Sequence, residues 1–377
     1  MATELTSALP TIHPVLDPLI ISLADPGAPA SGRTEQSQVE LQLEVEDVLN
    51  SDQWQLIGEY LNPYDYTTDT AKVSLHKELQ GALQHFIPNL SVSGSQAMSG
   101  VVKRYRISAR DVVDGEAQGS FNTSSPGLAW LAGNQYTQIG TDLTSGKAYL
   151  FLTTRSTTRR LHPSERIHLQ VLPITSGTPT VRIQAFFTDG TDQTDTVALS
   201  AATALVPFAV NITLPSYSKT VSTIDIDITG LSGTAQKLTY KLIAKPGPYL
   251  TQLFYANSLG GLEPIAFTGK AEELNDPTSE IFQAQEYPPT SGQEGNHTAF
   301  NQRAVDSFVL RSGYLSKAET RSLRDMTLRN QVFLLQDGEL LKLILNPATA
   351  RITKQGEFLH SLQISARFAY DQLAYTS

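Results

Sequence analysis

The chain has 377 residues, a net charge of −9 and no cysteine, so disulfides, thiolate nucleophiles and cysteine-ligated metal centres are excluded. Only 17% of the residues are charged while 40% are hydrophobic, which favours a mainly β protein, and the length predicts more than one domain. The negative charge argues against nucleic acid as a partner, and no apolar run reaches the ~18 residues expected of a membrane span. The first residues also lack the pattern of an export signal.

The first predicted unit is an extended N-terminal arm over residues 1–38. This segment is rich in proline, serine, alanine and glycine and has no sustained periodicity, but it holds an apolar island from Val15 to Leu23. Apolar side chains in this number would not remain in water. We therefore expect Val15, Leu19 and Ile21 to be ordered on another subunit, as a strand added to an exposed sheet edge.

A β-rich first domain is predicted over residues 39–173. Its first segment, "VELQLEVED", alternates apolar and acidic residues, as a half-buried strand with an acidic, solvent-facing side does. The segment from Trp54 is its predicted partner strand. Leucines at helical spacing from Leu75 to Leu83, followed by Pro88, predict a short helix.

A central immunoglobulin-like β-sandwich is predicted over residues 174–247, because strands with a period of two follow one another at regular spacing. The C-terminal β domain covers residues 248–377. It contains a predicted helix within residues 316–330, a hairpin with the turn Asp337-Gly338 and a last strand from about residue 361. The predicted fold is therefore mainly β and multi-domain, with one or two short helices.

Catalytic signatures are missing: the sequence has no nucleophile elbow, phosphate loop, zinc-protease motif or dinucleotide-binding glycine motif. We expect no enzymatic activity, no cofactor and no metal. Asp189, Asp192 and Asp195 are interpreted as solvated residues of a hairpin turn, with a calcium loop as the alternative. A glycan hydrolase using a carboxylate pair such as Glu263 and Glu272 is a third hypothesis for the whole protein.

Four arginines stand close together in an otherwise acidic chain, Arg155, Arg159, Arg160 and Arg166, and the first three are the candidate interaction residues. They are interpreted either as part of a solvated loop or as a contact for an acidic neighbour, such as the glutamate side of residues 39–47 on another subunit. Trp130 is expected in the core rather than in a sugar-binding site.

The segment "LFYANSLGG" contains a predicted turn at Asn257, Gly260 and Gly261. Adjacent glycines allow positive φ angles and close backbone approach, which a sharp corner between domains requires. A ligand-contacting loop is the alternative interpretation.

Five segments resemble, in the same order, structural proteins encoded in phage and prophage tail gene clusters of Bacteroidota. They are "YTTDTAKVSLHKELQGALQ", "YLFLTTRSTTRRLHPSERIHLQVLP", "LFYANSLGG", "SGYLSKAETRSLRDMTLRNQVFLL" and "LNPATARITKQGEFLHSLQISARFAYDQLAY". The resemblance covers about residues 54–375. One departure is Leu262-Glu263-Pro264, where an aromatic-Asp pair is expected.

The resemblance implies a virion protein that is made in the bacterial cytoplasm and located in the tail. Our hypothesis is a structural protein of a phage tail or tail-like particle that self-associates into a ring or hub and contacts other tail proteins. The alternative is a glycan- or receptor-binding β-sandwich module, on a tail tip or as an adhesin.

Overall fold

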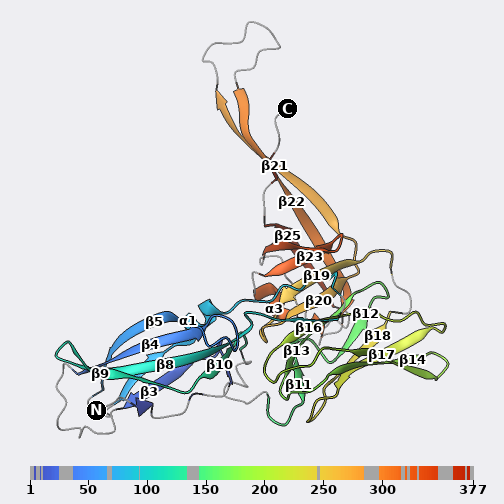
Figure 1. The fold of residues 1–377 in the computed structure, drawn as a ribbon. Coiled ribbons are helices and arrows are strands. Elements are labelled where there is room, and N and C mark those ends of the chain that lie inside the picture. Colours follow the sequence, from blue (N-terminus) through green and yellow to red (C-terminus); the bar gives the residue numbers. More distant parts are fainter. Residues whose placement is uncertain are drawn as a thin grey trace.

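The computed structural model describes residues 4–5, 9, 12–24, 37–65, 70–92, 94–133, 144–243, 247–283, 297–315, 319–320, 323–328, 331–346, 360–369 and 372–373. These residues form mostly β-strands, arranged in several sheets with little helix, which confirms the predicted multi-domain β architecture (Figure 1). In the described part of the chain, no helix is long and apolar enough to cross a membrane.

The first domain contains two sheets and helix α1 (His76–Ala82). One sheet has the order β1 (Glu4–Leu5), β3 (Ile20–Ala24) and β6 (Thr70–Ser74). The other has the order β2 (Ile12–Pro14), β10 (Gly127–Trp130), β8 (Val102–Val113), β4 (Gln38–Glu46) and β5 (Trp54–Pro63), with β9 (Glu116–Thr123) paired to β8. The predicted pairing of the first two long strands is confirmed as β4–β5.

The alternation in β4 sends its apolar side chains into the core, where Val39, Leu41 and Leu43 are fully buried. The acidic side of the strand is not a free acidic face. Its glutamates alternate with the core residues and meet arginines of the neighbouring strand β8, so most of the negative charge is neutralised within the chain. The ion pairs are Glu40–Arg110, Glu44–Arg106 and Glu46–Arg104.

The prediction that the apolar island of the arm lies on another subunit is wrong. Strand β3 pairs with β6, and β2 pairs with β10, both in the same chain. Val15, Leu19 and Ile21 are at most 6% exposed and belong to the core of the first domain. The prolines keep these strands short, but each strand pairs with another strand of the first domain. The apolar side chains are therefore buried without a second subunit.

The central β-sandwich has a sheet of β11 (Tyr149–Phe151), β13 (Ile167–Pro173), β16 (Phe208–Ile212) and β7 (Gly94–Ala97). The facing sheet has β12 (Thr158–Leu161), β18 (Lys237–Leu242), β17 (Val221–Thr229), β14 (Thr180–Phe187) and β15 (Asp192–Ala198). The sandwich core starts at Ala148, so the predicted boundary at residue 174 is too late. Every residue of β13 is buried. A strand that is buried on both faces has no alternation of apolar and polar residues, so its sequence does not indicate which sheet it joins.

The C-terminal domain has one large sheet and helix α3 (Arg324–Leu328), which lies within the segment predicted to be helical, as do the helical residues 319–320. Asp337 and Gly338 both have positive φ, at 51° and 89°, and join β23 to β24 as the predicted hairpin turn. The strand order is β20 (Leu262–Phe267), β19 (Thr251–Ala256), β23 (Val332–Gln336), β24 (Glu339–Asn346), β25 (His360–Phe368), β22 (His297–Leu315) and β21 (Glu272–Gln283), with β26 (Gln372–Leu373) paired to β22.

Strands β21 and β22 form a ribbon that projects away from the three domains (Figure 1). The inner part of β22 also pairs with β25, from Ser307 to Leu315, and Arg303 and Ala304 pair with β26. Beyond Arg303, β21 is the strand neighbour of β22 among the described residues. The outer ribbon is therefore two-stranded.

Candidate functional site: a polar junction between the domains

The turn predicted as a corner lies between β19 and β20, at the tip of a hairpin of the C-terminal domain. It does not link two domains but packs against both of the others. A Cβ atom at Gly260, where φ is +79°, would lie 2.2 Å from the carbonyl oxygen of Leu131 in the first domain. A Cβ atom at Gly261 would lie 2.2 Å from the carbonyl oxygen of Leu152, beside the sandwich. Both glycines are needed because backbone meets backbone here.

Polar contacts hold this tip in place. The Asn257 side chain donates to the carbonyl of Leu152 at 2.8 Å and accepts from the backbone N–H groups of its own turn. Asp325 of α3 accepts two hydrogen bonds from Ser258, at 2.9 and 2.8 Å. The N–H of Gly133 in the first domain donates to the Ser258 carbonyl at 2.7 Å. The three domains therefore meet at one hydrogen-bonded turn.

A buried ion pair lies next to the tip. Arg159 of β12 and Glu263 of β20 are 3.2 Å apart, and their side chains are 4% and 2% exposed. Glu263 also accepts hydrogen bonds from Thr153, Asn257 and the backbone N–H of Thr154. These hydrogen bonds and the ion pair compensate the buried carboxylate for the hydrogen bonds to water that it loses on folding. Burial, and to a lesser degree the negative charge of Glu263, raise the pKa of Tyr255 well above its usual value.

The other two predicted arginines contact the same C-terminal domain. Arg155 donates to the carbonyl of Pro264 at 2.5 Å, and Arg160 donates to the carbonyl of Tyr314 at 3.1 Å. The structure thus brings all three arginines together, but in a contact between domains of one chain. The hypothesis that they meet the glutamates of β4 on another subunit is not supported, because those glutamates already pair with β8.

A chain of polar side chains crosses the sandwich from the first domain to the C-terminal domain. Asn211 donates to the carbonyl of Val92 at 2.9 Å and accepts from His168 Nδ1 at 2.7 Å. His168 Nε2 accepts from Gln170 at 3.1 Å, and Gln170 in turn accepts from the N–H of Leu262 at 2.7 Å. Burial lowers the pKa of His168 to about 4, although the bond to Asn211 opposes this shift, so the imidazole is neutral.

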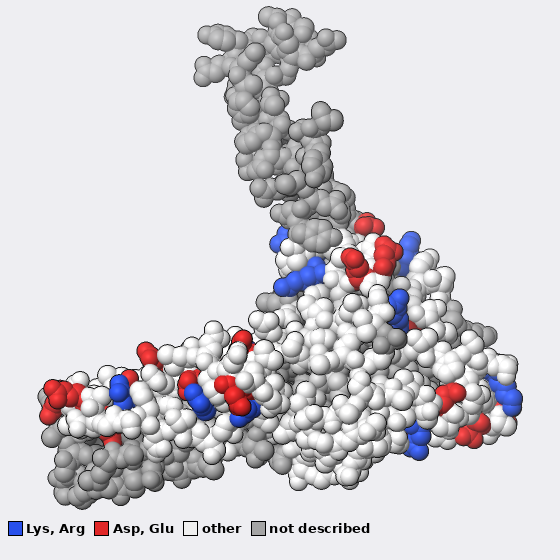
Figure 2. All heavy atoms as spheres, viewed as in Figure 1, with Lys and Arg blue, Asp and Glu red and all other residues white. Residues whose placement is uncertain are grey.

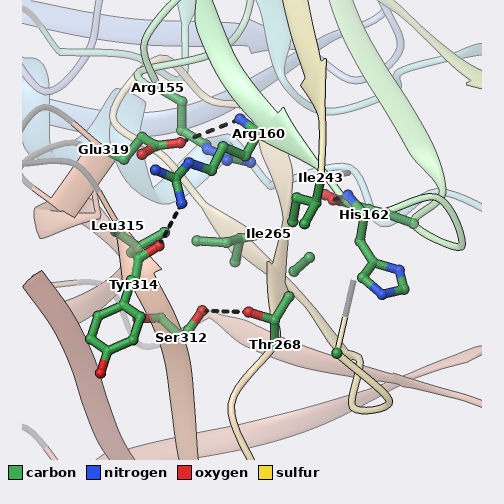
Figure 3. A pocket seen from close by; sticks show the side chains of 13 residues that line it. Arg155, Arg160, His162, Ile243, Ile265, Thr268, Ser312, Tyr314, Leu315 and Glu319 are labelled. Carbon is green, nitrogen blue, oxygen red and sulfur yellow. Dashed lines mark hydrogen bonds between the residues drawn. The ribbon is translucent and has the colours of Figure 1, made fainter. Parts of the chain in front are cut away.

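A cavity of about 200 Å³ opens between the sandwich and the C-terminal domain (Figure 3). Its polar lining includes Arg155, Arg160, His162 and Glu165 from the sandwich and Glu319 from the C-terminal domain. Burial raises the pKa of Glu165 to about 7, against the opposing effects of Arg155 and the His162 N–H.

Sequence reasoning did not single out His162, Glu165, His168 or Gln170 as a group. A signal was available for two of them, because His168 and Gln170 interrupt the apolar segment "IHLQVLP" of a strand that is buried throughout. Buried polar side chains in such a strand need partners, which here are Asn211 of the same sandwich and the N–H of Leu262 in the C-terminal domain.

The remaining candidates lie elsewhere. Glu272 is 49% exposed and pairs with Arg311, whereas Glu263 is buried, so the two carboxylates do not share an environment. Asp189 lies in the β14–β15 turn, beside Lys219, as expected for a hairpin. No group of three or more metal-ligating side chains occurs within the described ranges. Trp130 is 1% exposed, in the core as predicted.

No protein-family model and no curated protein matches the chain. Among solved structures, CBD12 from CALX1.2 aligns at 9% identity over 62% of this chain and 82% of its own, with a TM-score of 0.19. Dimeric latent PorU from Porphyromonas gingivalis aligns at 11% identity over 82% of this chain and 32% of its own, with a TM-score of 0.22. The chain thus spans about a third of PorU, and TM-scores this low carry no argument about function.

Proposed function

We propose that the chain is a structural protein of a phage tail or tail-like particle, which self-associates into a ring or hub and contacts other tail proteins. The observation that supports this proposal is the projecting ribbon of β21 and β22 (Figure 1). A two-stranded ribbon is marginally stable in water, and its open backbone edges are templates for further strands. A neighbouring subunit that adds a strand to the ribbon would pair the backbone edges that the described residues leave open.

The junction between the domains also fits this proposal. A body whose three domains are tied by Asn257, by the pair Arg159–Glu263 and by the His168 chain keeps one shape, and a subunit of a ring needs fixed angles between its contact surfaces. The N-terminal segment does not contribute to assembly in this proposal, since Val15, Leu19, Ile21 and Leu23 lie in the chain's own core.

The surface charge supports contact with other proteins rather than with nucleic acid. On the face shown in Figure 2, side chains of both signs are interspersed over the first domain, and the middle of the molecule is largely uncharged. Interfaces between proteins are depleted of charge at their centre, whereas nucleic-acid interfaces are strongly basic.

The test is to shorten the ribbon. Thr278 and Arg303 are partners in the register, so residues 279–302 can be replaced by Asn-Gly, which closes a two-residue hairpin and keeps the pairing of β22 with β26. We expect the full chain to form discrete oligomers by light scattering and negative-stain imaging, and the shortened chain to be a folded monomer by circular dichroism. A full chain that stays monomeric at high concentration, or a shortened chain that assembles equally well, contradicts the proposal.

One observation favours glycan recognition as the second candidate function. Tyr314 is 67% exposed beside the cavity, and sugar rings stack on exposed tyrosine faces. A glycan array would test this candidate. Binding that disappears in Tyr314→Ala would support it, and an array without signal at high protein concentration would remove it.

A further inference from the structure

The cavity between the sandwich and the C-terminal domain has room for a small ligand. Its volume of about 200 Å³ is far above the ~10–15 Å³ that one water molecule requires. One part of its wall is apolar, formed by Ile243, Ile265 and Leu315, and the other part is polar. This division suits a ligand with a carbon skeleton and one polar group.

The polar part offers more hydrogen-bond donors than the protein uses. Among the described residues, the guanidinium of Arg155 has one hydrogen bond, to Pro264, and that of Arg160 has one, to Tyr314. A guanidinium carries five N–H donors in a planar fork. Both groups line the cavity, so the donors left over are available to an acceptor placed inside it.

His162 supplies a further donor. Its Nδ1 accepts a hydrogen bond from the N–H of Ser164 at 3.2 Å, so the ring proton is on Nε2. The residue is 7% exposed, and Nε2 is buried without a hydrogen-bond partner in the described part of the chain. Figure 3 shows His162 and Arg160 on opposite sides of the cavity. A buried donor of this kind requires an acceptor oxygen.

The charge of the cavity selects among acceptors. Arg155 and Arg160 are positive, and Glu319 and Glu165 oppose them, but with a pKa of about 7 Glu165 is only partly ionised at neutral pH. The cavity is therefore weakly positive. A dianion such as phosphate would carry more negative charge than this weak positive charge compensates, whereas a carboxylate carries one charge and its two oxygens match the guanidinium fork.

We propose that this cavity binds the carboxylate of a small organic acid, held by Arg155, Arg160 and the Nε2–H of His162, with the carbon skeleton against Ile243 and Ile265. The proposal does not depend on the assembly role, because the cavity's residues in β22, Ser312, Tyr314 and Leu315, lie at the inner end of that strand and outside the replaced residues 279–302. Loss of assembly in the shortened chain leaves the cavity intact, so the two proposals fail separately.

Titration calorimetry on the full chain tests the proposal, with four probes: acetate, D-glucuronate, D-glucose and inorganic phosphate. We expect glucuronate to bind and glucose, which has the same ring without the carboxylate, not to bind. Acetate binding alone would identify a bare carboxylate as sufficient. Equal binding of glucose, tighter binding of phosphate, or no binding of any probe at millimolar concentration would overturn the proposal.

Two variants and one control locate the site. Arg160→Gln should weaken glucuronate binding by about tenfold or more, because it removes a charge-assisted hydrogen bond. His162→Phe keeps a ring and removes the unpartnered donor together with the bond from Ser164, so it should still fold and bind more weakly. Arg166→Gln changes an exposed arginine in the same segment that does not line the cavity, and should bind as the wild type does. Unchanged binding in both cavity variants would refute the assignment.

Discussion

The buried pair Arg159–Glu263 allows a sharp test of what holds the domains together. Glu263→Gln keeps the shape of the side chain but removes its charge, which takes from the guanidinium of Arg159, 4% exposed, the ion-pair partner that it has among the described residues. Breaking a buried pair from one side costs about 3–5 kcal/mol. The amide also places an NH₂ group among donors from Thr153 and Asn257, which adds to the cost. We therefore expect the upper half of this range.

Urea unfolding followed by tryptophan fluorescence measures this cost. The chain has two tryptophans, and Trp130 lies against the hairpin tip at Gly260. In a Trp54→Phe background, the emission of Trp130 therefore reports on the junction. The control is Asp189→Asn, which breaks the exposed pair with Lys219 and should change the unfolding free energy little.

A double variant completes the cycle. In Arg159→Met with Glu263→Gln the unpaired charge is gone, so the combined loss should be smaller than the sum of the single losses by about 2 kcal/mol or more. Single losses below about 1 kcal/mol, or losses that simply add, would refute the argument that the pair is desolvated and coupled.

Three further predictions concern other parts of the molecule. Gly260→Ala and Gly190→Ala both place alanine at positive φ, at +79° and +83°, which costs about 1–2 kcal/mol of stability. Only the first also places a Cβ atom against the Leu131 carbonyl, so Gly260→Ala should cost more and shift the Trp130 emission to the red. Equal costs in urea unfolding would show that the tip is loosely packed. Protonation of His168 should destabilise the fold: since its pKa falls from 6.5 to about 4 on folding, stability is complete above about pH 6.5 and falls by about 3 kcal/mol as the pH drops to about 4. Glu165, with its raised pKa, acts in the opposite direction, so the measurement is the difference in pH dependence between the wild type and His168→Gln, and identical profiles would contradict the prediction. Leu23→Ala, at a fully buried position of β3, should cost about 2–5 kcal/mol independently of protein concentration, because β3 packs on its own chain; a cost that varies with concentration would restore the inter-subunit strand.

Short-range patterns in the sequence predicted the elements that depend on neighbours in the chain. The alternation in residues 39–47 and the turn at Asp337-Gly338 each specify a strand or hairpin within about ten residues, and both are present as predicted. The apolar island near Val15 was also recognised as buried. Its partner strand β6 lies some fifty residues further on, and no local pattern identifies which edge a short strand will join.

The junction could be predicted only in part for the same reason. The arginines from Arg155 to Arg160 stood out by charge, and the glycines near Gly260 stood out by their pairing. The partner of Arg159 is Glu263, 104 residues away, and its burial depends on how the sandwich meets the C-terminal domain. Long-range contacts of this kind follow from the packing of domains, which periodicity does not encode.

Strand β7 has a mechanical consequence. Its residues belong to the first domain in sequence, but they pair with β16 of the sandwich through four register pairs, from Gly94↔Asn211 to Ala97↔Phe208. A force that pulls these two domains apart would therefore act on the backbone hydrogen bonds between β7 and β16 as well as on the chain between β10 and β11. The first domain and the sandwich would stretch as a single body until β7 detaches, and more of the force would then pass to that connecting chain.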